Sequence, residues 1–216
     1  MKIGVLGTGM VGNAIATKLV ALGHEVRMGS RTAGNEHAQA WAASVGAGRS
    51  AGDFAVAAGH GELVFSCIAG VHTLEALEAA GHENLDGKVL VDVGNPLDFS
   101  HGMPPTLAVC NTDSLGEQIQ RAFPDARVVK TLNTMNCTVM VDPGSAPGEH
   151  DVFVCGANED AKRQVGALLE SFGWPPGRIV DLGGIAASRG VEMYLSLWLS
   201  LYGALGTPHF NIGVAR

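Results

Sequence analysis

Short apolar runs and longer amphipathic stretches alternate along the chain from its first residues. Lys2–Leu6 is an apolar run long enough for one buried strand, and the amphipathic stretch that follows ends near Leu22. A second apolar run begins at Glu25 and ends near Met28. A short apolar run is typical of a buried strand, and apolar residues spaced three to four apart are typical of a helix. The start of the chain is therefore expected to form a strand, a helix and a second strand.

The same alternation predicts the rest of the secondary structure. Strands are expected over residues 62–68, 88–93, 127–132, 151–155 and 178–182. Helices are expected over residues 36–44, 50–58, 73–80, 114–123, 160–172 and 185–205. Asp113 or Ser114 is the expected N-cap of the helix over 114–123. Residues 97–111 and 141–149 contain several prolines and glycines and are expected to be loops. Strands that alternate with helices favour an α/β fold with a parallel sheet, in which ligands bind at the carboxyl ends of the strands.

A glycine-rich turn separates the first strand from the first helix. Residues 7–12 read Gly-Thr-Gly-Met-Val-Gly, which fits the G-x-G-x-x-G pattern of dinucleotide-binding proteins. Gly7 permits the tight turn, Gly9 lets backbone amides approach a pyrophosphate, and Gly12 lets the helix pack closely on the strand. The unpaired amides at the start of the helix would supply the anion site. The strand before the glycines and the helix after them favour dinucleotide binding over a purely structural turn.

The second strand ends in residues that indicate which dinucleotide binds. An NAD site usually has Asp or Glu at this place, where the carboxylate accepts hydrogen bonds from the ribose hydroxyls. This chain has Ser30 and Arg31 there. A hydroxyl and a guanidinium can bind a 2′-phosphate, which a carboxylate would repel. These two residues favour NADP over NAD.

The carboxyl ends of four predicted strands should meet at the nucleotide. They are residues 7–12, 30–31, 67–72 and 94–96, so Asn95 joins the candidate cofactor-binding residues. Residues 97–111, which follow, are either a surface excursion or a lid over the site. His72 either donates a hydrogen bond near the nicotinamide or closes a loop.

The composition restricts the possible functions. Hydrophobic residues make up 46% of the 216 residues and charged residues 16%, which is typical of a compact globular protein. The net charge of −7 argues against a general nucleic-acid surface. The four cysteines form no C-x-x-C pair, so neither a metal site nor a disulfide framework is expected. There is no apolar stretch of about 18 residues, and a strand at Lys2 leaves no room for a leader peptide, so we expect a cytoplasmic protein.

The last predicted helix, over residues 185–205, has apolar residues on most of its faces. Packing on the sheet can cover one face, and a second subunit can cover another. We therefore expect a homodimer.

Several segments together resemble one known family. They read GTGMVG near the start, GSR after the second strand, RVVKTLNTMN around residue 130, and DVFVCGANEDAKRQV, RIVDLGGIAASRGVEM and FNI in the last third. With these motifs the chain resembles the NADP oxidoreductases that act with the deazaflavin coenzyme F-420 (F420), and the cytosolic reductase domain of certain membrane metalloreductases is similar. The resemblance implies a Rossmann-type doubly wound parallel sheet with a small C-terminal α/β portion that ends in an apolar helix. Residues 1–140 would form the dinucleotide-binding domain, and residues 141–216 would close the hydride-transfer site.

The resemblance also implies which residues bind the cofactors. The NADP contacts fall on Thr8, Gly9, Met10 and Val11 at the pyrophosphate, Ser30 and Arg31 at the 2′-phosphate, Cys67, Ile68, Ala69 and His72 along the adenosine and nicotinamide side, and Asn133, Met135 and Cys137 under the nicotinamide. F420, as the second substrate, would contact Asn133, Phe210 and Asn211.

Direct hydride transfer between the nicotinamide and deazaflavin rings is the activity that this resemblance implies. Both partners are hydride carriers, so the protein orients the rings and excludes water, and no catalytic residue is obligatory. Two alternatives stay open: an NADPH-dependent dehydrogenase or reductase of a small metabolite or flavin, and a non-catalytic NADP-sensing domain. Some archaeal members of the family have a histidine where this chain has Asn133, which leaves the second hydride partner open.

Overall fold

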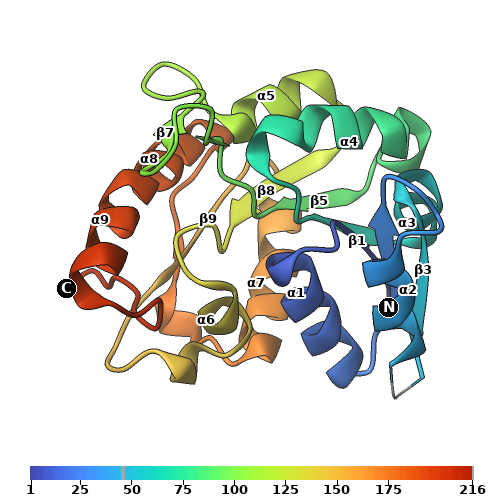
Figure 1. Ribbon diagram of the computed structural model, residues 1–216, viewed down its shortest axis with the longest axis horizontal. Helices are drawn as coiled ribbons and strands as arrows, with labels where there is room; N and C mark the ends of the chain where they lie inside the picture. Colours follow the sequence, from blue (N-terminus) through green and yellow to red (C-terminus); the bar gives the residue numbers. More distant parts are fainter. Residues whose placement is uncertain (45–46, 216) are drawn as a thin grey trace.

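The computed structural model describes residues 1–44 and 47–215 and has an α/β architecture of three layers (Figure 1). The strands of the central sheet are β1 (Lys2–Leu6), β2 (Glu25–Ser30), β3 (Arg49–Asp53), β4 (Leu63–Ser66), β5 (Val89–Asp92), β8 (Arg127–Thr131), β9 (Val152–Cys155) and β10 (Ile179–Asp181). The α-helices are α1 (Met10–Ala21), α2 (Glu36–Ala43), α3 (Phe54–His60), α4 (Thr73–Ala80), α5 (Leu115–Ala122), α6 (Cys137–Val141), α7 (Glu159–Phe172), α8 (Ser188–Met193) and α9 (Leu195–Leu205). Two further strands, β6 (Leu97–Asp98) and β7 (Thr106–Leu107), form a separate hairpin.

The central sheet has the strand order β10-β9-β8-β5-β4-β1-β2-β3. Neighbouring strands are parallel from β3 to β8, so the carboxyl ends of these six strands meet at one edge. β9 pairs antiparallel with β8, and β10 pairs parallel with β9. The predicted Rossmann-type sheet is therefore confirmed, and its last two strands run in the opposite direction to the other six.

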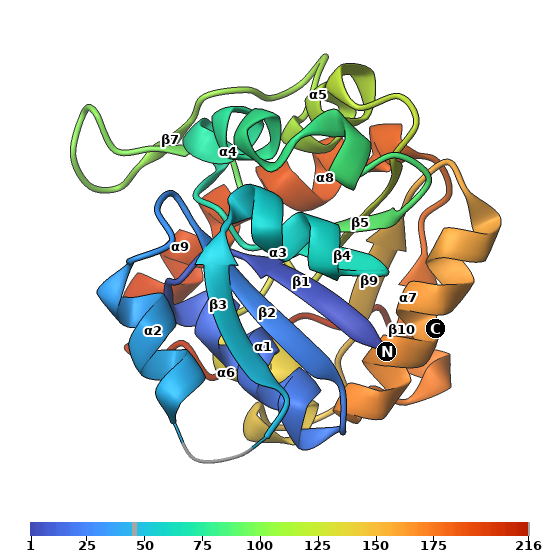
Figure 2. The same ribbon diagram turned by 90° about the vertical axis from the view of Figure 1, so that its right-hand side faces the viewer.

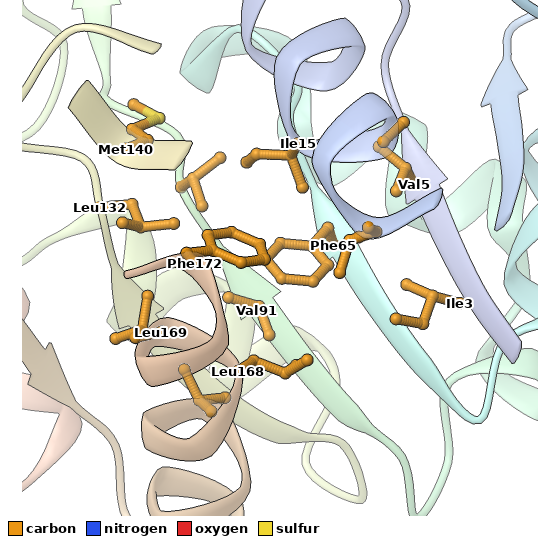
Figure 3. Packing of buried hydrophobic residues seen from close by; sticks show 14 of the residues in the cluster. Ile3, Val5, Ile15, Phe65, Val91, Leu132, Met140, Leu168, Leu169 and Phe172 are labelled. Carbon is orange, nitrogen blue, oxygen red and sulfur yellow. The ribbon is translucent and has the colours of Figure 1, made fainter. Parts of the chain in front are cut away.

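Helices cover both faces of the sheet (Figure 2). The buried side chains of α1, α2, α6 and α7 belong to one hydrophobic cluster, and those of α3, α4 and α5 belong to a second cluster on the other face. Phe65 of β4 and Phe172 of α7 lie at the centre of the first cluster (Figure 3). Burial of one such side chain contributes about 1.5–3 kcal/mol. The two clusters therefore support the sheet edge at which ligands are expected to bind.

The prediction of a helix over residues 50–58 is wrong for the first half of this segment. Residues Arg49–Asp53 form strand β3, which pairs in parallel with β2, and α3 begins only at Phe54. The alanines of this segment favour a helix, but backbone hydrogen bonding to the edge of β2 makes residues Arg49–Asp53 a strand. Asp53 then caps α3, because its carboxylate accepts a hydrogen bond from the amide of Val56 at 2.8 Å.

Three further segments differ from expectation. Residues 97–111 contain the hairpin of β6 and β7, which projects from the upper left of the molecule in Figure 1. The expected loop over residues 141–149 begins at the end of α6 and contains a 3-10 turn at Pro143–Ser145. The helix expected over residues 185–205 is divided into a 3-10 turn at Ile185–Ala187, α8 and α9.

The last helix, α9, is largely uncovered in the single chain. Leu195 is its only buried residue, and Leu197, Tyr202 and Leu205 are between 45% and 55% exposed, in a helix that the structure describes in full. In residues 1–44 and 47–215, no helix combines the length and apolar character that a membrane span needs. β9 and β10 extend the same sheet as the first six strands. The division into residues 1–140 and 141–216 stays a prediction, and Arg216, the last residue of the second part, lies outside the described residues.

Candidate functional site

The glycine turn after β1 has a geometry that depends on its glycines. Gly7 has a φ of +117°, and a Cβ there would lie 2.5 Å from the carbonyl oxygen of Cys67. At Gly12 a Cβ would lie 2.0 Å from the carbonyl oxygen of Gly7, so α1 packs directly against the turn. At Gly9 nothing lies within 4 Å of an added Cβ. Gly7 and Gly12 therefore build the turn, and Gly9 leaves open space beside the backbone.

Helix α1 begins at this turn without a side-chain cap. Its N-cap is Gly9, whereas side-chain oxygens of Asn35, Ser114 and Asn158 cap α2, α5 and α7. In α1, all of whose residues are described, the first turn holds no acidic residue. The first amides of a helix lack partners within the helix, and the helix dipole adds partial positive charge there. This end of α1 therefore fits a phosphate group.

A cleft of about 370 Å³, called the Ser30 cleft below, opens beside the turn. The predicted residues that line it are Gly7, Thr8, Gly9, Ser30, Arg31, Cys67, Ile68, Ala69 and His72. The Ser30 hydroxyl donates to the carbonyl oxygen of Thr32 at 2.6 Å, which orders the loop after β2. Arg31 is exposed and forms no hydrogen bond or ion pair with the described part of the chain, so its guanidinium is free to bind an anion in the cleft.

The Ser30 cleft also contains residues that sequence reasoning missed. They are Asn35, Phe54, Glu75, Ala76 and Ala79. The aromatic ring and the two alanines form an apolar wall from α3 and α4, and such a wall suits a flat base. Asn35 could have been found from its N-cap position, but only the strand order brings α3 and α4 beside the end of β2.

A second cavity of about 250 Å³, called the Asn133 pocket below, adjoins the Ser30 cleft, because Cys67, Ile68 and Ala69 line both. The other predicted residues in its wall are Val11, Asn95, Asn133 and Met135. The remaining wall residues are Gly70, Val93, Gly94, Leu97, Phe99, Met140, Leu195 and Trp198. None of these described wall residues carries a charged side chain, so the pocket suits an uncharged ring.

Two asparagines order one side of the Asn133 pocket. The side-chain amide of Asn95 donates to the carbonyl oxygen of Asn133 at 2.8 Å, and that of Asn133 donates to Oδ1 of Asn95 at 2.9 Å. The Asn133 amide also donates to the carbonyl oxygen of Val191 at 3.1 Å, which ties the pocket to α8. Both amide protons of Asn133 are then used, and its Oδ1 is free to accept a hydrogen bond from a ligand.

The thiols near the glycine turn stay protonated at neutral pH. Burial raises the pKa of Cys67, and the nearby carboxylate of Asp92 raises it further. Burial also raises the pKa of Cys137. The thiolate is the form of cysteine that attacks substrates or binds metals, so these thiols do not support nucleophilic chemistry at neutral pH.

Met10, Cys137 and His72 are among the predicted residues that do not line the Asn133 pocket. Met10 and Cys137 line a separate hollow of the surface, together with Thr8 and Gly9. His72 ends the 3-10 turn before α4 and lines the Ser30 cleft but not the Asn133 pocket.

The C-terminal tail contacts two residues in the wall of the Asn133 pocket, Trp198 through Phe210 and Met135 through Asn211, whose side-chain amide lies 4.0 Å from the Met135 sulfur. Phe210 stacks on Trp198 with ring centroids 5.3 Å apart, and Trp198 lines the pocket. The side-chain amide of Asn211 donates to the carbonyl oxygen of Asp151 at 2.9 Å and to Nδ1 of His150 at 3.1 Å, so it anchors the tail. Sequence reasoning missed Trp198, because the pattern of an apolar helix does not show which residue faces a cavity.

Comparisons with known proteins indicate the family of the chain. A family model described as "NADP oxidoreductase coenzyme F420-dependent" matches residues 2–96. The F420-dependent NADP reductase of Methanocaldococcus jannaschii is 29% identical over 146 residues, which are 67% of this chain and 64% of that protein. Metalloreductase STEAP3 of Rattus norvegicus is 29% identical over 200 residues, which are 88% of this chain and 36% of that protein. The chain thus spans a little under two thirds of the length of the first relative and about a third of the length of the second.

A solved structure that matches the chain over its full length adds to these relatives. It comes from Arthrobacter sp. FB24 and is provisionally designated an F420-dependent NADP reductase. The two chains are 52% identical, each is covered to 100%, and the TM-score is 0.94. Identity at this level over the whole chain, together with the family match across the glycine turn and Ser30, confirms the predicted family. The chain belongs to the F420-dependent NADP oxidoreductases.

Proposed function

We propose that this oxidoreductase transfers a hydride directly between NADP(H) and F420. The observation that carries the proposal is the junction of the Ser30 cleft with the Asn133 pocket at Cys67, Ile68 and Ala69. A dinucleotide in the cleft can reach this junction with its nicotinamide end, and the uncharged pocket suits a second ring beside it. The family pairs these two cofactors in its name.

In this proposal the Ser30 cleft binds NADP(H). The amides at the start of α1 bind the pyrophosphate, with Gly9 leaving room for it. Arg31 and Ser30 bind the 2′-phosphate, which requires the Ser30 hydroxyl to turn from Thr32 toward the ligand. Oδ1 of Asn133 accepts a hydrogen bond from the carboxamide of the nicotinamide.

The Asn133 pocket orients the second ring and excludes water from the reacting atoms. When bound, NADPH supplies the hydride and F420 accepts it, and the accompanying proton comes from solvent. The protein therefore contributes orientation, which can lower a barrier by about 7–11 kcal/mol. The apolar side chains of Val11, Met135 and Leu195 suit this role because they neither react nor hold water.

Reduction of a small carbonyl or imine compound would require a different pocket. Hydride addition to a carbonyl carbon leaves an alkoxide, so such enzymes place a proton donor beside the substrate. Of the described residues in the wall of the Asn133 pocket, only Cys67 can titrate, and its raised pKa makes it a weak proton donor. The pocket therefore favours a partner that carries hydride on a ring.

Anaerobic mixing of NADPH with a panel of oxidised carriers tests the proposal by absorbance. We expect loss of the F420 absorbance together with equimolar oxidation of NADPH, and slower reduction of FMN and FAD. Reduction of flavins or metabolites without reduction of F420 would favour the metabolite or flavin reductase. Tight NADPH binding without reduction of any carrier would favour the sensor.

We further propose that the chain acts as a homodimer and that residues 141–216 close the hydride-transfer site. The uncovered apolar face of α9, with Leu197 and Leu205 each 55% exposed, supports a second copy at this face. Size-exclusion chromatography with light scattering tests the dimer, and a monomer at micromolar concentration would refute it.

The expected cytoplasmic location stays a prediction, which cell fractionation tests.

A further inference from the structure

A buried cluster of charges lies next to the Asn133 pocket and has no part in the mechanism above. Lys130 of β8 and Asp92 of β5 are 0% exposed, and Glu192 of α8 is 1% exposed. Nζ of Lys130 lies 2.7 Å from Oδ2 of Asp92 and 2.9 Å from Oε1 of Glu192. It also donates to the carbonyl oxygen of Gly94, so all three protons of the ammonium group are used.

The cluster holds one cation and two carboxylates, and each carboxylate has a second partner. Oδ1 of Asp92 accepts from the amide of Gly94 at 3.0 Å. The Glu192 carboxylate accepts from the amides of the first two residues of α5 at 2.8 and 3.0 Å, where the helix dipole favours negative charge. Burial alone would lower the pKa of Lys130, but the carboxylates of Asp92 and Glu192 outweigh it and raise the pKa, so the lysine stays charged.

Lys130 links two parts of the wall of the Asn133 pocket. On the sheet side it holds Gly94, which lines the pocket. On the other side it holds Glu192 near the end of α8, and α9, which follows, brings Leu195 and Trp198 into the same wall. This ammonium group is therefore one of the contacts that hold α8, and with it α9, against the sheet.

We propose that Lys130 is a positioning residue for hydride transfer, because it fixes the distance between the Gly94 side and the α9 side of the Asn133 pocket. The inference rests on the proposed function. Without the ammonium group, the carboxylates of Asp92 and Glu192 repel each other, and α8 and α9 move away from the sheet. A displacement of about 1 Å between reacting groups can reduce a rate about 10²-fold. The phosphate contacts of NADP(H) in the Ser30 cleft involve neither α8 nor α9, so the affinity for NADP(H) changes much less than the rate.

The variant Lys130→Met tests this inference, and Lys162→Met is its matched control. Lys162 of α7 is also buried, at 5% exposure, and also bridges two carboxylates, with Nζ 2.8 Å from Glu159 and 2.8 Å from Asp181. It lines neither the Ser30 cleft nor the Asn133 pocket. Both variants lose a buried lysine with two carboxylate partners, but only Lys130→Met loses it beside the pocket.

Three measurements separate positioning from a general loss of stability. They are the single-turnover rate of hydride transfer from NADPH to F420, the dissociation constant of NADPH, and amide hydrogen exchange of residues 188–205 in the cofactor-free protein. We expect Lys130→Met to slow transfer by about 10²-fold and to speed exchange in α8 and α9, with a much smaller change in NADPH affinity. Lys162→Met should change neither transfer nor exchange in these helices.

A folded Lys130→Met variant with the wild-type transfer rate would overturn the inference, and so would equal slowing by Lys162→Met. If Lys130→Met does not fold, Glu192→Gln decides, because it keeps the shape of the side chain and removes the charge that binds Lys130. Slower transfer with faster exchange in α8 and α9 supports the inference, and no change overturns it. If the wild-type protein reduces no F420, the proposed function fails instead, and the exchange measurement alone decides whether Lys130 positions α9.

Discussion

Substitutions at Gly9 and Gly12 should have different effects on stability, because an added side chain has open space at Gly9 and none at Gly12. Gly9 has φ −74° and ψ −174°, an extended conformation that valine adopts readily, and nothing lies within 4 Å of an added Cβ. Gly9→Val should therefore change the free energy of unfolding by less than about 1 kcal/mol. Gly12→Ala places a Cβ 2.0 Å from the carbonyl oxygen of Gly7, which only a shift of α1 can relieve. It should lower the free energy of unfolding by about 1–3 kcal/mol.

Gly9→Val should weaken NADPH binding strongly, although it hardly changes the free energy of unfolding. The side chain in Gly9→Val occupies the space through which a pyrophosphate would approach the amides of α1. Loss of two hydrogen bonds to a charged group costs about 3–6 kcal/mol, which corresponds to an increase of about 10²- to 10⁴-fold in Kd. Calorimetric titration with NADPH measures the affinity, and urea unfolding measures the stability.

Two results would refute this reasoning. Gly9→Val that folds and binds NADPH with the wild-type affinity would mean that the pyrophosphate does not bind at this turn. Gly12→Ala with the wild-type free energy of unfolding would mean that the close packing of α1 on Gly7 is not needed for stability.

Three other perturbations test the cleft, the tail and the α5–α8 contact. Arg31→Ala should raise the Kd of NADPH by at least about tenfold and leave that of NADH unchanged, since only NADPH carries the 2′-phosphate; equal losses in calorimetry would contradict this role. Deletion after Thr207 removes Phe210, so transfer to F420 should fall about 10²-fold while NADPH still binds; a folded truncation with the full rate would place the tail outside the site. Hydrogen bonds from Arg189 lower the pKa of Glu117 below its ordinary value of about 4.3, so the pair stabilises the folded state above that pH and the stabilisation is lost as the pH falls through the lowered pKa. Thermal unfolding from pH 6 to pH 3 should therefore show a shallower decline of Tm for Glu117→Gln than for the wild type, and parallel curves would exclude a contribution from this pair.

Local patterns in the sequence were sufficient where the structure depends on local interactions. The strand Lys2–Leu6 and the glycine turn combine an apolar run with residues that favour the tight turn, and both were predicted. The cap of α5 was also visible, because Ser114 can accept from the amide of Glu117 within the same turn, and does so at 3.2 Å. These features need no information about distant parts of the chain.

The sequence did not reveal features that depend on distant parts of the chain. Residues Arg49–Asp53 are a strand because β2 offers an unpaired edge, and their own composition does not favour one. Lys130 sits in an apolar run like any strand residue, and its partners Asp92 and Glu192 lie 38 and 62 positions away. The pairing of Asn133 with Asn95 is likewise visible only once β5 and β8 lie side by side.

If the dinucleotide binds at the uncapped start of α1, as proposed above, the folding equilibrium depends on the supply of cofactor. The first amides of α1 are satisfied by a bound anion only in the folded chain, so a dinucleotide that binds there shifts the equilibrium away from the unfolded state. At a concentration one hundred times its Kd, such a ligand stabilises the fold by about 2.7 kcal/mol, which raises the Tm of a chain of this size by roughly 5–11 °C. A thermal melt at graded NADPH concentrations should show this rise. Where proteases remove unfolded chains, the abundance of the protein then follows the size of the NADP(H) pool.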